Sequence, residues 1–109
     1  MEKVKIEYIY KDNKVETLPD KVKDAYELIY GIGRPKNIRE AIKILKELAQ
    51  GANPNLNACN MLGKLYYEGE HVEKDIKSSY NYYKISDERD NEEGIYRIGL
   101  FLEVIIKPE

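Results

Sequence analysis

The stretch that decides the fold is ACNMLGKLYYEGEHVEKDIKSSYNYY, residues 58–83. Its first half has one apolar face at helical spacing, made of Ala58, Met61, Leu62, Leu65 and Tyr66. Gly69 favours a helix end there, and Asp75 can cap a new helix because its carboxylate accepts from free backbone N–H groups. The residues that share one face of this second helix are Ile76, Ser79, Tyr80 and Tyr83. The stretch therefore predicts a helix–loop–helix unit.

The same unit recurs along the chain. Three positions return 38 residues later, Gly31 as Gly69, Asn37 as Asp75 and Ala41 as Ser79. The pair Leu62-Gly63 returns 36 residues later as Ile98-Gly99. A period in the high thirties, built from helix pairs, is typical of an α-solenoid, in which each pair buries its apolar stripe against a neighbour.

Three more helices are expected outside this stretch. The first begins at Asp20, and its apolar face is Val22, Ala25, Tyr26 and Ile29. The second begins at Asn37, with Glu40 three residues later in a pattern like a capping box. The third begins at Asp90 or Asn91, and its residues expected to point inward are Ile95, Ile98, Gly99 and Leu102. The helix that opens the quoted stretch itself can start at Asn55 or Asn57.

Gly63 and Gly99 fall in the middle of two of these helices. A glycine inside a helix costs about 1 kcal/mol relative to alanine. We therefore expect both to allow close approach of a neighbouring helix. The other glycine pair, in Gly31-Ile32-Gly33, lacks the third glycine and the Lys-Ser/Thr of a phosphate-binding loop and indicates a turn.

The chain resembles the Sel1-like repeat family, relatives of the tetratricopeptide repeats. That family has Ala, then Leu-Gly, Tyr, a Gly-x-Gly-Val loop, Asp, Lys-Ala, an aromatic pair and Ala-Ala. The residues at the corresponding positions here are Ala58, Leu62-Gly63, Tyr66, Gly69, Val72, Asp75, Ser79 and Tyr82-Tyr83. The departures are His71 for the second loop glycine, Ser78-Ser79 for Lys-Ala, Ser86-Asp87 for Ala-Ala, and Asp24-Ala25 for Leu-Gly in the first unit.

The resemblance implies a mainly α fold, a short right-handed α-solenoid of about two and a half repeats. Its units are expected at residues 20–54 and 55–90, with a capping helix at 91–106, in a domain spanning 19–109. Residues 1–18 alternate in apolar character through Val4, Ile6, Tyr8 and Tyr10, which predicts an N-terminal β-hairpin packed on the helices.

Composition excludes several functions. The 109 residues carry 18 Lys and Arg against 20 Asp and Glu, a net charge of -2, which argues against nucleic acid as a partner. A single cysteine, Cys59, and a single histidine, His71, rule out an internal disulfide and the common zinc motifs. No cofactor is expected. The absence of long apolar runs and of a leader-like start predicts a cytoplasmic protein that contacts no membrane.

The candidate partner-binding residues are Tyr67, Tyr82, Tyr30, Glu70 and His71. Tyr67 and Tyr82 are expected to point outward, where tyrosines are good interface anchors. Codon bias and core packing are the alternative explanations for the many tyrosines. For Cys59, a structural thiol in a helix is the expectation.

These features favour a non-enzymatic protein–protein interaction module, as the resemblance to a family of adaptors and scaffolds implies. A specific form of this hypothesis is a small bacterial immunity or inhibitor protein that occludes a toxin or another effector. One alternative is a homo-oligomeric structural protein, such as a homodimer. Another is an enzyme or small-ligand binder that uses His71 with Glu70 or Asp75.

Overall fold

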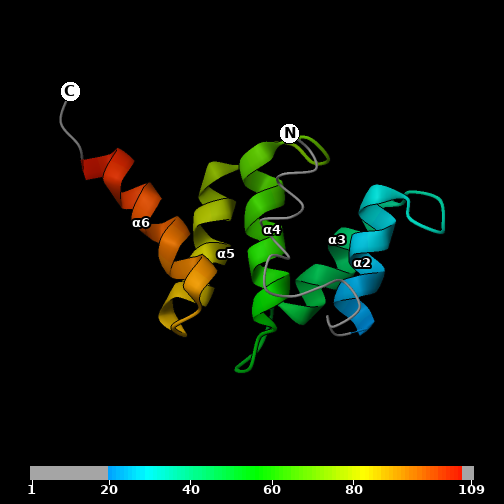
Figure 1. Cartoon of the computed structure of the whole chain (residues 1–109), viewed down its shortest axis with the longest axis horizontal. Coiled ribbons are helices and arrows are strands. Elements are labelled where there is room, and N and C mark those ends of the chain that lie inside the picture. The colour runs from blue at the N-terminus through cyan, green and yellow to red at the C-terminus, as the bar shows by residue number, and fades with distance from the viewer. Residues whose placement is uncertain (1–19, 107–109) are drawn as a thin grey trace. The chain divides into compact units, whose positions relative to one another are not determined.

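The computed structural model describes residues 20–106, which contain five α-helices and no strand (Figure 1). The helices are α2 (Asp20–Tyr30), α3 (Ile38–Leu48), α4 (Leu56–Glu68), α5 (Ile76–Glu88) and α6 (Glu92–Ile106). The chain forms two compact units with their boundary between Ile44 and Leu45, inside α3. From here on, the first unit and the second unit are these two, and not the repeats expected from the sequence. The hairpin expected at residues 1–18 lies outside the described residues. It stays a prediction, as does the division into residues 1–18 and 19–109.

The loop that follows α2 repeats after α4. Gly31 and Gly69 each take a left-handed conformation, with φ of 68° and 67°. In the first loop the Asn37 N–H donates to the Leu28 carbonyl over 2.9 Å, and 38 residues later the Asp75 N–H donates to the Tyr66 carbonyl over the same distance. The period seen in the sequence is therefore a repeat of backbone geometry.

The helix that follows each loop starts in the same way. The Asn37 Oδ1 accepts from the Glu40 N–H over 3.1 Å, and the Asp75 Oδ1 accepts from the Ser78 N–H over 3.1 Å. These side chains satisfy backbone donors that a helix start leaves unpaired.

The 36-residue offset is equally visible at the starts of α4 and α6. Asn55 caps α4 by accepting from the Ala58 N–H at 2.9 Å, and Asn91 caps α6 by accepting from the Gly94 N–H at 3.2 Å. Of the two starts that the sequence allowed for α4, Asn55 and Asn57, Asn55 is therefore the one that caps the helix. The fold is mainly α and is built from repeated helix–loop–helix units, as predicted.

Gly63 allows the close approach that the sequence predicted. A Cβ there would lie 2.7 Å from the Tyr83 ring, so the ring of α5 rests directly on the α4 backbone. The Ser79 hydroxyl, fully buried, donates to the Gly63 carbonyl over 2.6 Å. Gly94, which the sequence analysis did not single out, fits α6 against α5, since a Cβ would lie 2.5 Å from the Ser86 Cβ.

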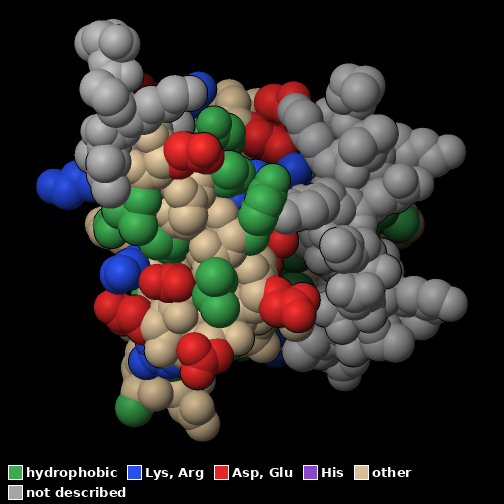
Figure 2. Space-filling model, turned by 60° about the vertical axis from the view of Figure 1, so that its left-hand side comes forward, with side chains coloured by type: hydrophobic (Ala, Val, Ile, Leu, Met, Phe, Trp, Pro, Cys, Tyr) green, Lys and Arg blue, Asp and Glu red, His purple; other side chains and the backbone are tan. Residues whose placement is uncertain are grey.

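The prediction for Gly99 is wrong, because an added Cβ there meets no atom of residues 20–103 within 4 Å. Two of its neighbours, Ile95 and Leu102, were also expected to point inward but are 47% and 42% exposed. Ile98 is buried as predicted. Hydrophobic side chains are accordingly visible on the side of the molecule where α6 lies (Figure 2). Periodicity identified one apolar face on α6, but α5 covers only part of it.

Ile76 shares a face of α5 with Ser79 and Tyr83 but is 43% exposed, whereas those two residues are buried. It is the first residue of the helix, next to the cap. In the first unit, the face predicted for α2 is buried and consists of Val22, Ala25, Tyr26 and Ile29.

Candidate partner-binding surface

A group of four aromatic rings joins α4, α5 and α6 in the second unit. We call Tyr67, Tyr80, Tyr83 and Phe101 the Phe101 cluster. The Phe101 ring centroid lies 6.1 Å from that of Tyr67, 5.5 Å from Tyr80 and 6.5 Å from Tyr83. Tyr67 and Tyr80 meet Phe101 edge to face, with interplanar angles of 89°. Such contacts hold rings in fixed orientations and add to the energy of burial.

The cluster runs from the core to the surface. Tyr83 is 2% exposed, Tyr80 and Phe101 are half-buried, and Tyr67 is 50% exposed. The Lys74 ammonium lies 5.6 Å from the centre of the Tyr67 ring, within the range of a cation–π contact. Tyr67 therefore presents a large, oriented, half-exposed ring beside a positive charge.

A second pair of rings involves Tyr82. Its ring stacks on Tyr66 with centroids 6.1 Å apart and an interplanar angle of 6°. Lys46 lies 5.8 Å from the Tyr66 ring centre, and its hydrogen bond with Tyr66 raises the pKa of the Lys46 ammonium. Burial raises the pKa of Tyr82, whose side chain is half-buried. Tyr67 and Tyr82, predicted together, thus belong to different ring groups.

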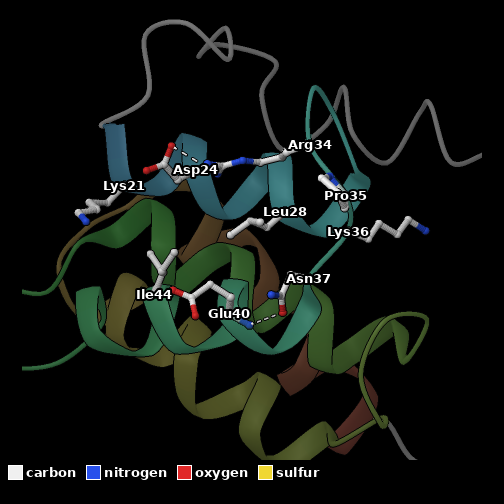
Figure 3. A pocket seen from close by; sticks show the side chains of 9 residues that line it. All are labelled: Lys21, Asp24, Leu28, Arg34, Pro35, Lys36, Asn37, Glu40 and Ile44. Carbon is white, nitrogen blue, oxygen red and sulfur yellow. Dashed lines mark hydrogen bonds and ion pairs between the residues drawn. The ribbon is translucent and has the colours of Figure 1, made fainter.

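The first unit contains an open hollow between α2 and the start of α3, of about 460 Å³ (Figure 3). Leu28 and Ile44 lie on its two sides, and Arg34 approaches Asp24 to 3.9 Å. The described residues that line it are Lys21, Asp24, Leu28, Arg34, Pro35, Lys36, Asn37, Glu40 and Ile44. None of these nine is a serine, cysteine or histidine, so they do not form a Ser–His or Cys–His pair.

Tyr30, the remaining aromatic candidate, belongs to this first unit. It lies at the end of α2, with its ring centroid 4.8 Å from that of Tyr26, and is half-buried. Tyr67, Tyr82, Glu70 and His71 all belong to the second unit. Their joint use by one partner stays a prediction.

The thiol of Cys59 fits a structural role. It is fully buried on α4, and burial raises its pKa to about 11. At neutral pH it is therefore protonated and a poor nucleophile. Among residues 20–106, no three His, Cys, Asp or Glu side chains are grouped to hold a metal ion.

Comparison with known families agrees with the repeated geometry. The model of the Sel1 repeat matches residues 23–53 and 56–86, together more than half of the chain. The protein belongs to the Sel1 repeat family. Repeats of this family generally mediate protein–protein interactions. Neither the search of curated proteins nor that of solved structures found a match. None of the described helices combines the length and apolar character needed to cross a membrane.

Where this chain departs from the Sel1 pattern at close helix–helix contacts, the substituted residues are still small. Ser79, in place of Ala, is fully buried and bonds to Gly63. Ser86, the first of the residues in place of Ala-Ala, is also fully buried and lies against Gly94. Serine is close to alanine in size, so these departures preserve the packing.

The loop departure has a backbone explanation. At Gly33, the equivalent position of the first loop, the backbone φ is 74°, a conformation that favours glycine. Among residues 20–106, Asp90 is the only non-glycine residue with a positive φ, so the φ of His71 is negative. His71, which replaces the second loop glycine of the Sel1 pattern, therefore adopts an ordinary conformation. His71 lies in the loop that connects α4 to α5 and is half-buried, and the preceding residue, Glu70, is exposed.

Three residues of the site escaped the sequence reasoning, namely Tyr80, Lys74 and Phe101. The available signal for Phe101 was its register, since it lies 36 residues after Leu65, which is buried. Its contact with Tyr67 depends on packing between helices distant in sequence.

Proposed function

We propose that this Sel1 repeat protein binds another protein through the exposed edge of the Phe101 cluster, with Tyr67 as the anchor. The observation that carries the proposal is the half-exposed Tyr67 ring, held edge-on against Phe101 and beside Lys74. An aromatic anchor that is already oriented loses little conformational entropy when a partner covers it. The neighbouring Glu70 and His71 lie in the loop that follows α4 and extend the proposed contact.

The test is affinity capture from the lysate of the source organism with the full chain as bait. Tyr67→Ala should lose the partner that the wild type captures. Ile32→Ala is the control, because Ile32 is a large apolar residue that is 47% exposed, similar to Tyr67, but lies in the first unit, outside both the cluster and α6. Thermal melts must first show that both variants remain folded. Capture of the same partner by Tyr67→Ala at wild-type yield would refute the proposed surface.

We also propose a finer function, in which the partner is a toxin or another effector and binding occludes it. The net charge of -2 supports this proposal. If the captured protein is a nuclease or toxin, stoichiometric addition of the Sel1 protein should abolish its activity in vitro. Full activity of the captured effector in the complex would refute inhibition and leave the binding role intact.

A further inference from the structure

Helix α6 has an exposed apolar stripe on the side that α5 does not cover. We call Ile95, Gly99 and Leu102 the α6 seam. These residues are spaced by four and three positions, so they share one side of the helix. Ile95 is 47% and Leu102 is 42% exposed, and among the described residues no neighbour lies within 4 Å of a Cβ added to Gly99 between them.

The chain itself shows what covers this stripe in another repeat. The positions 36 residues earlier are Cys59, Gly63 and Tyr66 on α4. There α5 covers the glycine, with the Tyr83 ring against Gly63 and the Ser79 hydroxyl on its carbonyl. The α6 seam thus has the register of a built helix–helix contact but exposes its residues.

Charge distinguishes the possible occupants of the seam. Glu92 lies one turn before Ile95, and Glu103 lies one turn after Gly99; both are exposed along the same edge of α6. Arg97, the one basic residue described on α6, is paired with Glu93 over 2.8 Å. A second copy of this chain would bring two acidic edges together. A helix with lysine or arginine beside its apolar stripe would complement them.

We propose that the α6 seam docks an amphipathic helix of a partner protein, in the mode by which grooves bind helical peptides. The bound helix places an aromatic ring over Gly99, as Tyr83 lies over Gly63, and basic side chains opposite Glu92 and Glu103. This surface is separate from the one anchored by Tyr67, so either proposal can fail alone.

The probe is a synthetic peptide with the sequence of residues 75–89, in which Asp87 and Glu88 are replaced by lysine. It keeps the residues that cover Gly63 and adds the basic edge. The isotope-labelled full chain is titrated with it up to about 1 mM, and amide shifts are followed by NMR. We expect amide shifts at Ile95, Gly99 and Leu102. The unmodified peptide should bind more weakly than the lysine variant, and high salt should weaken the binding of the lysine variant.

Gly99→Leu is the decisive variant. Leucine favours the helix over glycine, so the variant should melt at or above the wild-type temperature, while its side chain blocks the ring. Peptide binding should weaken by about tenfold or more, the scale of an interface hot spot. Tyr67→Ala should bind the peptide normally.

Three results would overturn the proposal. The first is no shift at the seam, and the second is shifts on α4 instead. The third is self-association of the free wild-type chain in sedimentation experiments, if Gly99→Leu abolishes this self-association. That result would assign the seam to a second copy of the chain.

Discussion

At the scale of single residues, Gly63 and Gly99, which are equivalent in the repeat, should respond oppositely to alanine. Gly63→Ala places a Cβ 2.7 Å from the buried Tyr83 ring, and overpacking of this kind costs about 1–3 kcal/mol. Gly99→Ala adds a Cβ that meets none of the described residues within 4 Å and should gain about 1 kcal/mol of helix stability. Urea denaturation of the two variants measures both effects. Stabilisation by both substitutions would show that the Tyr83 ring does not hold its position.

The sequence alone could not separate these two glycines. Both follow an aliphatic residue in the repeat register, and both predicted a close contact. Register tells which residues share a face of the helix, but the presence of a covering helix is a fact of tertiary structure. The Tyr83 ring lies against Gly63, whereas no residue in the described part of the chain covers Gly99.

Cys59 should be inert in the folded protein. Its complete burial and raised pKa of about 11 leave little thiolate at neutral pH, and a thiol reagent cannot reach it. We expect Ellman's reagent to react at the rate of unfolding under native conditions and rapidly in urea. Rapid reaction of the native protein would contradict the burial of this thiol.

At the scale of helices, the Asp75 cap should make stability depend on pH. Hydrogen bonds from Ser78 lower the pKa of Asp75 below its ordinary value of 3.8. The stabilisation is therefore complete above that value and is lost as the pH falls through the lower pKa of the folded state. Asp75→Asn keeps a capping oxygen without a charge, so its melting temperature should fall less than that of the wild type on acidification.

Two comparisons check this prediction. At neutral pH, Asp75→Asn should melt close to the wild type, because asparagine is also a good cap and occupies three equivalent positions here, Asn37, Asn55 and Asn91. Asp75→Ala removes the acceptor and should melt lower at every pH. Identical acid sensitivity of wild type and Asp75→Asn would show that the carboxylate does not act through its charge.

The helices themselves were the most predictable part of the molecule. Their starts follow from side chains that accept backbone N–H groups, such as Asn55 and Asp75, and such signals are local in sequence. The exposure of Ile95 and Leu102 was not predictable, because one stripe on α6 is divided between a covered and an uncovered part.

At the scale of the whole molecule, membership of the Sel1 repeat family and the repeated loops account for the architecture of each unit. The outward position of Tyr67 was expected from the sequence and is observed, while its role in binding stays a prediction. Phe101, which orients Tyr67, was not selected because the two residues lie on different helices and meet only after packing.

The central claim is that the Phe101 cluster is the partner-binding surface of this protein. Its most direct test is the dissociation constant of the captured partner, measured by calorimetry for the wild type, Tyr67→Ala and Ile32→Ala. We expect Tyr67→Ala to weaken binding by at least about tenfold, as for an interface anchor, and Ile32→Ala to leave it unchanged. Equal dissociation constants for the wild type and a folded Tyr67→Ala protein would contradict the claim.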